Sequence, residues 1–244
     1  MRWVDEAVVL SARPQGEGSL VVTLLTRERG RHAGLVRGAR RGQGRGIFEP
    51  GTRVAAQWQA RLAEHLGSLR CELLGGCAAG LLDDPRRLSC LAAAAATAEA
   101  VLPEREAAPA AFAGFVRLLE ALSADRGWAD DYVRWEFALL AELGFGLDLT
   151  RCSATGATAD LAFVSPRSSQ AVSRTAGLPY RDRLLPLPAF LLGAAAAPTV
   201  QDIGDGLRLT GFFLERHALA PLSRNLPPAR RRFVDRMSQV ATIS

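Results

Sequence analysis

The chain contains no lysine, and all 30 of its basic residues are arginine. A Walker A loop needs a lysine on the nucleotide phosphates, and Schiff-base catalysis needs a lysine amine, so both chemistries are excluded. The motifs GxSxG, HExxH, SxxK and GxGxxG and the EF-hand loop are also absent from the sequence. We therefore expect a protein that is not an enzyme and has no cofactor.

Cysteine and histidine are few and scattered. The four cysteines form no CxxC pair, and the three histidines do not lie at ligand spacing from them. No metal site is predicted, and the thiols are expected to be reduced and buried. His32 lies among arginines at the start of a predicted strand, where a surface position or a nucleic-acid contact is expected.

Long hydrophobic runs are missing as well. The longest apolar stretch, LPLPAFLLGAAAAP from Leu185, is too short and too rich in proline to span a bilayer. The N-terminal segment MRWVDEAVVL has two acids ahead of its apolar run and no small-residue cleavage site, which argues against a secretory signal. A cytoplasmic location without membrane association is expected.

The positive charge is concentrated near the N-terminus. Residues 1–79 hold 12 Arg against 7 Asp and Glu, whereas residues 80–244 hold 18 against 18. Within the first part, residues 27–53 hold 8 Arg against only two acids, Glu28 and Glu49. Such an excess is typical of a surface for a polyanion such as nucleic acid. The alternative is a solvated surface of a chain that uses arginine alone as its base.

Residues 3–74 show the alternation and turn spacing of a small β-barrel. The predicted strands are Val4–Arg13, Leu20–Thr26, His32–Gly38, Thr52–Leu62 and Ser68–Leu74. Five short strands in a segment of this length are typical of the OB-fold, which often binds nucleic acid. The glycine- and arginine-rich segment 39–46 is expected to form a basic loop between the third and fourth strands.

Alternation also predicts which side chains of the last two strands point inward. The expected inward residues are Val54, Ala56, Trp58, Ala60, Leu62, Leu69, Cys71 and Leu73. A hairpin of these strands would place Arg53, Arg61 and Arg70 together on the outer side of the sheet.

The period changes to a helical one after residue 80. Asp84 and Pro85 predict the N-cap and first residue of a helix that runs to Val101. An apolar stripe predicts a second helix that ends at Gly144, with Trp128, Tyr132, Trp135, Leu139 and Leu143 along it.

Loops with short strands or turns are expected over residues 146–185, and two further helices near Gly204–Leu219 and Pro227–Ala241. The predicted fold class is α+β, with a five-stranded OB-type barrel in residues 1–79 and a mostly α-helical domain in residues 80–244.

Three segments resemble one known family. Val8–Arg41 contains Thr26 to Gly30 followed by Gly34 to Arg40, which looks like the "T-x-x-x-G" and "G-x-V-x-G-x-R" opening of RecO, the bacterial recombination mediator. Leu139–Cys152 (LLAELGFGLDLTRC) and Pro228–Met237 (PARRRFVDRM) are similar to later segments of the same family.

The resemblance implies DNA repair and recombination through binding of single- and double-stranded DNA, annealing of complementary strands, and help in loading RecA onto coated single strands. It also implies two partners, RecR and the acidic tail of the single-stranded-DNA-binding protein, and a location at the nucleoid. Many relatives carry a four-cysteine zinc site after the LDL turn. Here no cysteine follows Cys152, so we expect hydrogen bonds and apolar packing to hold residues 150–175.

We assign two sets of candidate residues. The expected DNA-binding residues are Arg31, Arg37, Arg40, Arg41, Arg45, Arg53 and Arg61. The rim of a pocket for the acidic tail is assigned to Arg134, Arg216, Arg230, Arg231 and Arg232. Two alternatives remain open: an RNA-binding or ribosome-associated OB protein, which competition between RNA and single-stranded DNA would reveal, and an enzyme of unrecognised type, which a turnover screen would reveal.

Overall fold

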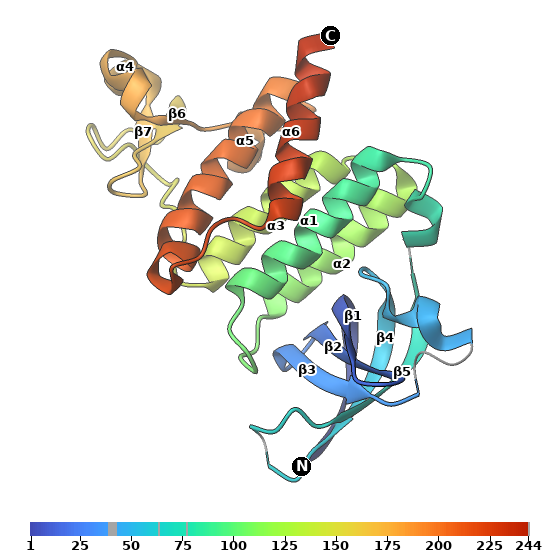
Figure 1. Cartoon of the computed structure of the whole chain (residues 1–244). Helices are drawn as coiled ribbons and strands as arrows, with labels where there is room; N and C mark the ends of the chain where they lie inside the picture. The colour runs from blue at the N-terminus through green and yellow to red at the C-terminus, as the bar shows by residue number, and fades with distance from the viewer. Residues whose placement is uncertain (39–42, 63, 77, 244) are drawn as a thin grey trace. The chain divides into compact units, whose positions relative to one another are not determined.

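Five strands near the N-terminus close into a barrel. They are β1 (Arg2–Gln15), β2 (Ser19–Thr26), β3 (Gly30–Val36), β4 (Arg53–Gln59) and β5 (Ser68–Gly75), in the order β1-β2-β3-β5-β4. The pair β3–β5 is parallel and the other pairs of the barrel are antiparallel (Figure 1). The predicted α+β fold, an OB-type barrel followed by a mostly helical region, is confirmed.

The structure is a computed structural model that describes residues 1–38, 43–62, 64–76 and 78–243; for residues 43–45, 78–79 and 240–243 it describes the backbone alone. The chain divides into two units. The first comprises Met1–Trp128 and Pro227–Arg230, and the second comprises Ala129–Leu226 and Arg231–Ser244. The domain boundary between residues 79 and 80 stays a prediction.

The interior of the barrel is filled by alternating side chains. Val54, Ala56 and Trp58 on β4 are at most 2% exposed, as predicted, and Leu69 on β5 is 3% exposed. The residues between them on β4 therefore face outward, because successive side chains of a strand point to opposite faces.

The predicted alternation is wrong at two positions. Leu62 is 48% exposed because β4 ends at Gln59, before this residue is reached. Leu73 is 58% exposed, and the pairing of β4 with β5 shifts between Arg53 and Val54. A shift of this kind increases the local twist, which explains why the end of β5 leaves the barrel interior.

Three rings fill one end of the barrel interior. Trp3 and Trp58, which are partners across β1 and β4, stack with centroids 5.7 Å apart. His32 lies 4.9 Å from each ring in an edge-on arrangement and is 6% exposed. The expectation of a surface or nucleic-acid-contacting histidine is therefore wrong. A side chain at Gly67, whose φ is +66°, would collide with Trp58, so this turn requires glycine.

The buried histidine has an unusual electrostatic environment. Neither ring nitrogen of His32 has a hydrogen-bond partner among the described residues. Burial, followed by the positive charge of Arg105, lowers the pKa of His32 from 6.5 to about 4. The folded barrel therefore holds a neutral imidazole at neutral pH.

The first unit also contains two helices. α1 (Pro85–Val101) has the predicted bounds, and the Asp84 side chain caps it by accepting hydrogen bonds from the backbone N–H groups of Arg86 and Arg87. α2 (Pro109–Ala124) was not predicted. Its buried residues recur at helical spacing and could have revealed it; they are Ala111, Phe112, Phe115, Leu118, Leu119 and Leu122.

The second unit is built around helices. α3 (Trp128–Glu142) buries the middle of the predicted stripe, whereas Trp128 and Leu143 at its ends are half-buried. α5 (Val200–Phe213) begins before the predicted Gly204, since Thr199 and Asp202 form a capping box there. α6 (Pro228–Ile243) contributes most of its residues to this unit and matches its predicted range.

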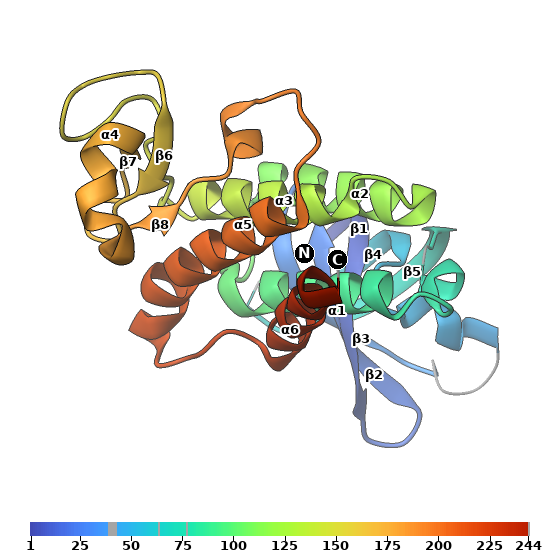
Figure 2. The same ribbon diagram turned by 90° about the horizontal axis from the view of Figure 1, so that it is seen from above.

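A small sheet interrupts the helices, as expected for residues 146–185. β6 (Leu161–Val164) lies between β7 (Ala171–Ser173) and β8 (Leu185–Pro186), and the short helix α4 (Arg174–Gly177) follows β7 directly (Figure 2). No helix within the described part of the chain is long and apolar enough to cross a membrane.

We predict that His32 makes the stability of the barrel depend on pH. Because the folded pKa is below the unfolded one, this contribution is complete above pH 6.5 and falls as the pH drops towards 4. Urea unfolding at pH 7.5 and 4.5 gives the free energy of unfolding at each pH. Between these two values the free energy of unfolding of His32→Leu should fall by about 2 to 3 kcal/mol less than that of the wild type.

The control is His65→Ala, which changes an exposed histidine and should keep the acid sensitivity of the wild type. An equal loss of stability in His32→Leu and the wild type would contradict the assignment.

Candidate nucleic-acid interface

Part of the arginine excess in residues 27–53 is neutralised by one carboxylate. Glu6 on β1 pairs with Arg27 through one oxygen and with Arg53 through the other, and Arg53 binds it with both Nε and Nη2. Hydrogen bonding from Arg53 is the main cause that lowers the pKa of Glu6 below its ordinary value. Arg53, predicted to bind DNA, is thus held in a network on the barrel surface.

Arg31 is anchored by a loop more than 70 residues away in sequence. Its Nε donates to the Leu102 carbonyl over 2.7 Å, and its Nη1 lies 3.1 Å from Glu104 Oε1. The Arg31 side chain is only 18% exposed. The loop approaches the strand so closely that a Cβ at Gly30 would lie 1.6 Å from the carbonyl oxygen of Glu106. Arg31 therefore serves the structure of the first unit.

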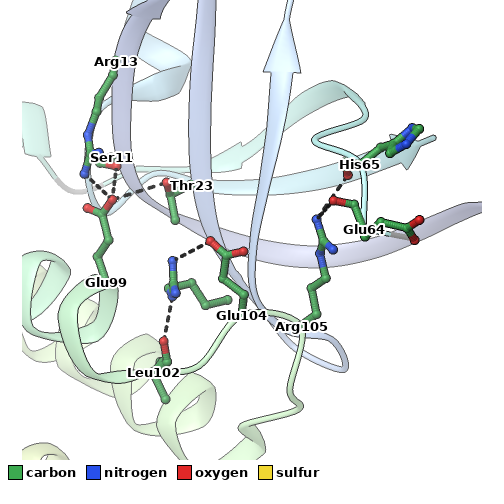
Figure 3. A network of polar contacts seen from close by, with 10 residues as sticks. Ser11, Arg13, Thr23, Glu64, His65, Glu99, Leu102, Glu104 and Arg105 are labelled. Carbon is green, nitrogen blue, oxygen red and sulfur yellow. Dashed lines mark hydrogen bonds and ion pairs between the residues drawn. The ribbon is translucent and has the colours of Figure 1, made fainter. Parts of the chain in front are cut away.

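Two further side chains, one on α1 and one in this loop, hold the barrel in place through hydrogen bonds (Figure 3). Glu99 on α1 accepts hydrogen bonds from Ser11, Arg13 and Thr23 on β1 and β2. Arg105 donates to the backbone carbonyls of residues 64 and 65, in the segment between β4 and β5. Side chains from the loop and from α1 thus satisfy barrel groups on several strands.

The other predicted DNA-binding residues differ in their surroundings. Arg37, after β3, and Arg61, after β4, are exposed and form no ion pair with a described residue. Arg40 and Arg41 lie outside the described residues. Arg45 lies in a short 3-10 helix, Gln43–Phe48, whose backbone alone is described at that position.

The arginines assigned to a partner pocket are not all available. Arg134 donates to the Phe190 carbonyl over 2.7 Å and lies over the Phe190 ring. Arg216 is exposed and lies over the ring of Phe212. Arg230, at 3% exposure, is buried, which makes it unsuited to a solvent-facing rim, while Arg231 and Arg232 are exposed. For Arg134, Arg216, Arg231 and Arg232 the assignment stays a prediction.

Comparison with known proteins shows two matching family models. The model described as Recombination protein O N terminal matches residues 1–76, and the one described as Recombination protein O C terminal matches residues 82–225. Proteins named DNA repair protein RecO from Rhodospirillum rubrum and Rhodospirillum centenum are each 53% identical. These alignments cover 97% and 100% of this chain and 96% and 98% of the relatives.

The chain belongs to the RecO family. The resemblance seen in the sequence is thereby confirmed, and a role in DNA repair and recombination follows. A third relative, the DNA repair protein RecO of Phenylobacterium zucineum, is 49% identical, and its alignment covers 100% of both chains.

The RecO segments quoted from the sequence lie at structurally defined places. Val8–Arg41 spans most of β1 together with β2 and β3, Leu139–Cys152 covers the end of α3 and the turn after it, and Pro228–Met237 opens α6. The family resemblance therefore involves both the barrel and the helical region.

Cys152 follows the LDL turn, where many RecO relatives are expected to bind zinc. The backbone N–H of Ser173 donates to its Sγ over 3.2 Å. Hydrogen bonding from the Ser173 side chain, followed by that from the Ser173 backbone, lowers the pKa of the thiol to about 6. The Cys152 N–H donates to the Ala157 carbonyl, and its own carbonyl accepts from Gly156. Hydrogen bonds thus connect residues 152–157 to β7, in agreement with the expectation for this segment.

Three exposed arginines of the barrel that form no ion pair with a described residue were not among the predicted DNA-binding residues: Arg29, in the turn between β2 and β3, and two arginines that lie on strands. Arg2 and Arg70 are exposed, lie on β1 and β5, and form no ion pair with a described residue. Strand alternation had already placed Arg70 on the outer face with Arg53. Arg2 was missed because β1 extends two residues further towards the N-terminus than predicted.

We predict that Glu6→Gln strengthens binding of this RecO-family chain to an oligonucleotide. The change releases Arg27 and Arg53 from their shared carboxylate, which should lower the dissociation constant about two- to fivefold at low salt. Fluorescence anisotropy with a labelled oligonucleotide measures the effect.

Glu17→Gln is the matched control, because it removes the same charge from an exposed residue that forms no ion pair with a described residue. If the two variants bind equally, the change reflects net charge alone and the role given to Glu6 is wrong.

Proposed function

We propose that the chain binds single- and double-stranded DNA through its barrel, anneals complementary strands and helps to load RecA onto coated single strands, without catalysing a change in covalent bonds. The observation that carries the proposal is a set of exposed barrel arginines that form no ion pair with a described residue. The set consists of Arg2, Arg29, Arg37, Arg61 and Arg70. Its members come from strand faces and from the segments between strands.

Annealing requires no reacting group. It requires a surface that screens two phosphate backbones and leaves the base edges free to pair. Guanidinium groups suit this task because their planar forks match phosphate oxygens. Among the described residues, no cluster of three or more His, Cys, Asp or Glu could hold a metal ion.

RecR and the acidic tail of the single-stranded-DNA-binding protein are the partners we propose, with a location at the nucleoid. Exposed arginines of the second unit, Arg216, Arg231 and Arg232, carry charge of the sign that an acidic tail requires. Support for these partners comes from membership of the RecO family.

A fluorescence assay for annealing of complementary strands tests the proposal. Two labelled strands should pair faster with the protein than without it, and the acceleration should persist when the strands are coated with single-stranded-DNA-binding protein. An unchanged rate under both conditions would refute the annealing function. Preferential displacement of bound DNA by RNA of the same length would favour an RNA-binding protein instead.

We predict that binding depends steeply on salt. If about 4 to 6 phosphates are engaged, the slope of the logarithm of affinity against the logarithm of salt concentration should be about −3 to −4 on single strands. Titrations at four or more salt concentrations measure it. An affinity that is the same at low and high salt would exclude binding through the DNA backbone.

We also predict that the double variant Arg37→Ala/Arg61→Ala weakens DNA binding and slows annealing while its melting temperature stays within about 1 °C of the wild type. Both side chains are exposed, so their loss should affect phosphate contacts and leave the fold intact. The expected loss is about 1 to 2 kcal/mol of binding free energy.

The matched control is Arg167→Ala/Arg183→Ala, which removes two exposed arginines from the second unit and the same total charge. Equal effects of the two double variants would indicate that overall charge, and not these positions on the barrel, determines DNA affinity.

A further inference from the structure

A small polar hollow lies on the outer face of the barrel where three strands run side by side. It has a volume of about 180 Å³, and it is lined by Arg2, Gln57, Trp58, Gln59, Ser68 and Arg70. Strand pairing brings these residues together, since Arg2 lies opposite Gln59, Gln59 lies opposite Ser68, and Gln57 lies opposite Arg70. The hollow is therefore built on the paired strands β1, β4 and β5.

The two arginines of the hollow are not neutralised. Neither Arg2 nor Arg70 forms an ion pair with a described residue, in contrast to Arg53, which Glu6 holds on the same sheet. Glu72 lies two residues beyond Arg70 on β5 and forms no ion pair with it. Two positive charges thus face one small volume that contains no carboxylate in its lining.

The size and lining of the hollow restrict what it can bind. Pockets for drug-sized ligands and cofactors occupy about 300 to 1,000 Å³ and are mostly apolar, so this hollow is too small and too polar for them. At about 30 Å³ for each water molecule, its volume is sufficient for a hydrated phosphate group. A guanidinium group can donate two parallel hydrogen bonds to two oxygens of one phosphate, and glutamine side-chain amides supply uncharged N–H donors beside it.

We propose that this hollow is a phosphate subsite for the backbone of single-stranded DNA, with Arg2 and Arg70 as its charged contacts and Gln57 and Gln59 as neutral donors. The inference rests on the proposed DNA-binding function and specifies where one strand lies. The strand follows the outer face of β1, β4 and β5. Phosphate contacts carry no sequence information, so the subsite binds strands of any sequence.

The double variant Arg2→Ala/Arg70→Ala tests the subsite by anisotropy of a labelled oligo-dT strand at several salt concentrations. We expect a dissociation constant about tenfold higher at low salt and a log–log salt slope shallower by about 1.4, because two single-strand phosphate contacts are lost. Arg70→Lys, which keeps the charge but not the fork, should retain most of the slope and lose part of the affinity. Both arginines are exposed, so the melting temperature should not change.

Arg167→Ala/Arg183→Ala again serves as the control for charge, and it should leave the salt slope unchanged. If Arg2→Ala/Arg70→Ala binds DNA like this control while the wild type binds and anneals, the subsite is refuted and the proposed function stands. A wild-type chain that binds no DNA refutes the proposed function and the subsite together. Binding of poly-glutamate is measured in the same way. If Arg2→Ala/Arg70→Ala loses poly-glutamate binding but keeps DNA binding, the hollow binds an acidic peptide and the inference is overturned.

Discussion

The barrel depends on β1, which must pair along both of its edges. Residues 2–8 of the strand pair with β4 and residues 7–15 pair with β2, so the two pairings overlap. The pairing with β2 shifts between Val9 and Ser11, and such a shift bends the strand just beyond this overlap. The register also determines which side chains face outward, because a slip of one residue would exchange the two faces. Trp3 and Ala7 thereby enter the core while Arg2 and Glu6 reach the surface. The charge pattern of the candidate interface thus follows from the pairing that closes the barrel.

The lack of lysine gives arginine two different tasks in this chain. Arg31 binds a backbone carbonyl and a carboxylate at once, which its planar fork permits and a single ammonium group does not match. Arg105 similarly reaches two consecutive backbone carbonyls. Arg37 and Arg61 have no such partners among the described residues, and their side chains are exposed to solvent. A cluster of arginines in the sequence therefore overstates the charge that is free to meet a polyanion.

Local patterns predicted much of the fold, and contacts between distant segments explain the errors. Alternation located β4 and its inward residues, and the Asp84–Pro85 pair located the start of α1. The role of Arg31 was not predictable, since its partners lie 71 and 73 residues further along the chain. His32 was misplaced for the same reason: Trp3 and Trp58, which enclose it, come from two other strands.

The division between paired and free arginines bears on how a strand-annealing surface can work. A surface that held DNA with every arginine would bind the product duplex as firmly as the single strands, and release would be slow. Glu6 forms ion pairs with two arginines of the barrel, and Glu99 and Glu104 form one each with two more. These carboxylates therefore reduce the number of arginines that can contact phosphate. The free arginines supply contacts that are individually weak and indifferent to base sequence. In the annealing that we propose, such contacts let two strands shift against each other on the barrel until their bases pair, after which the duplex holds itself together without the protein.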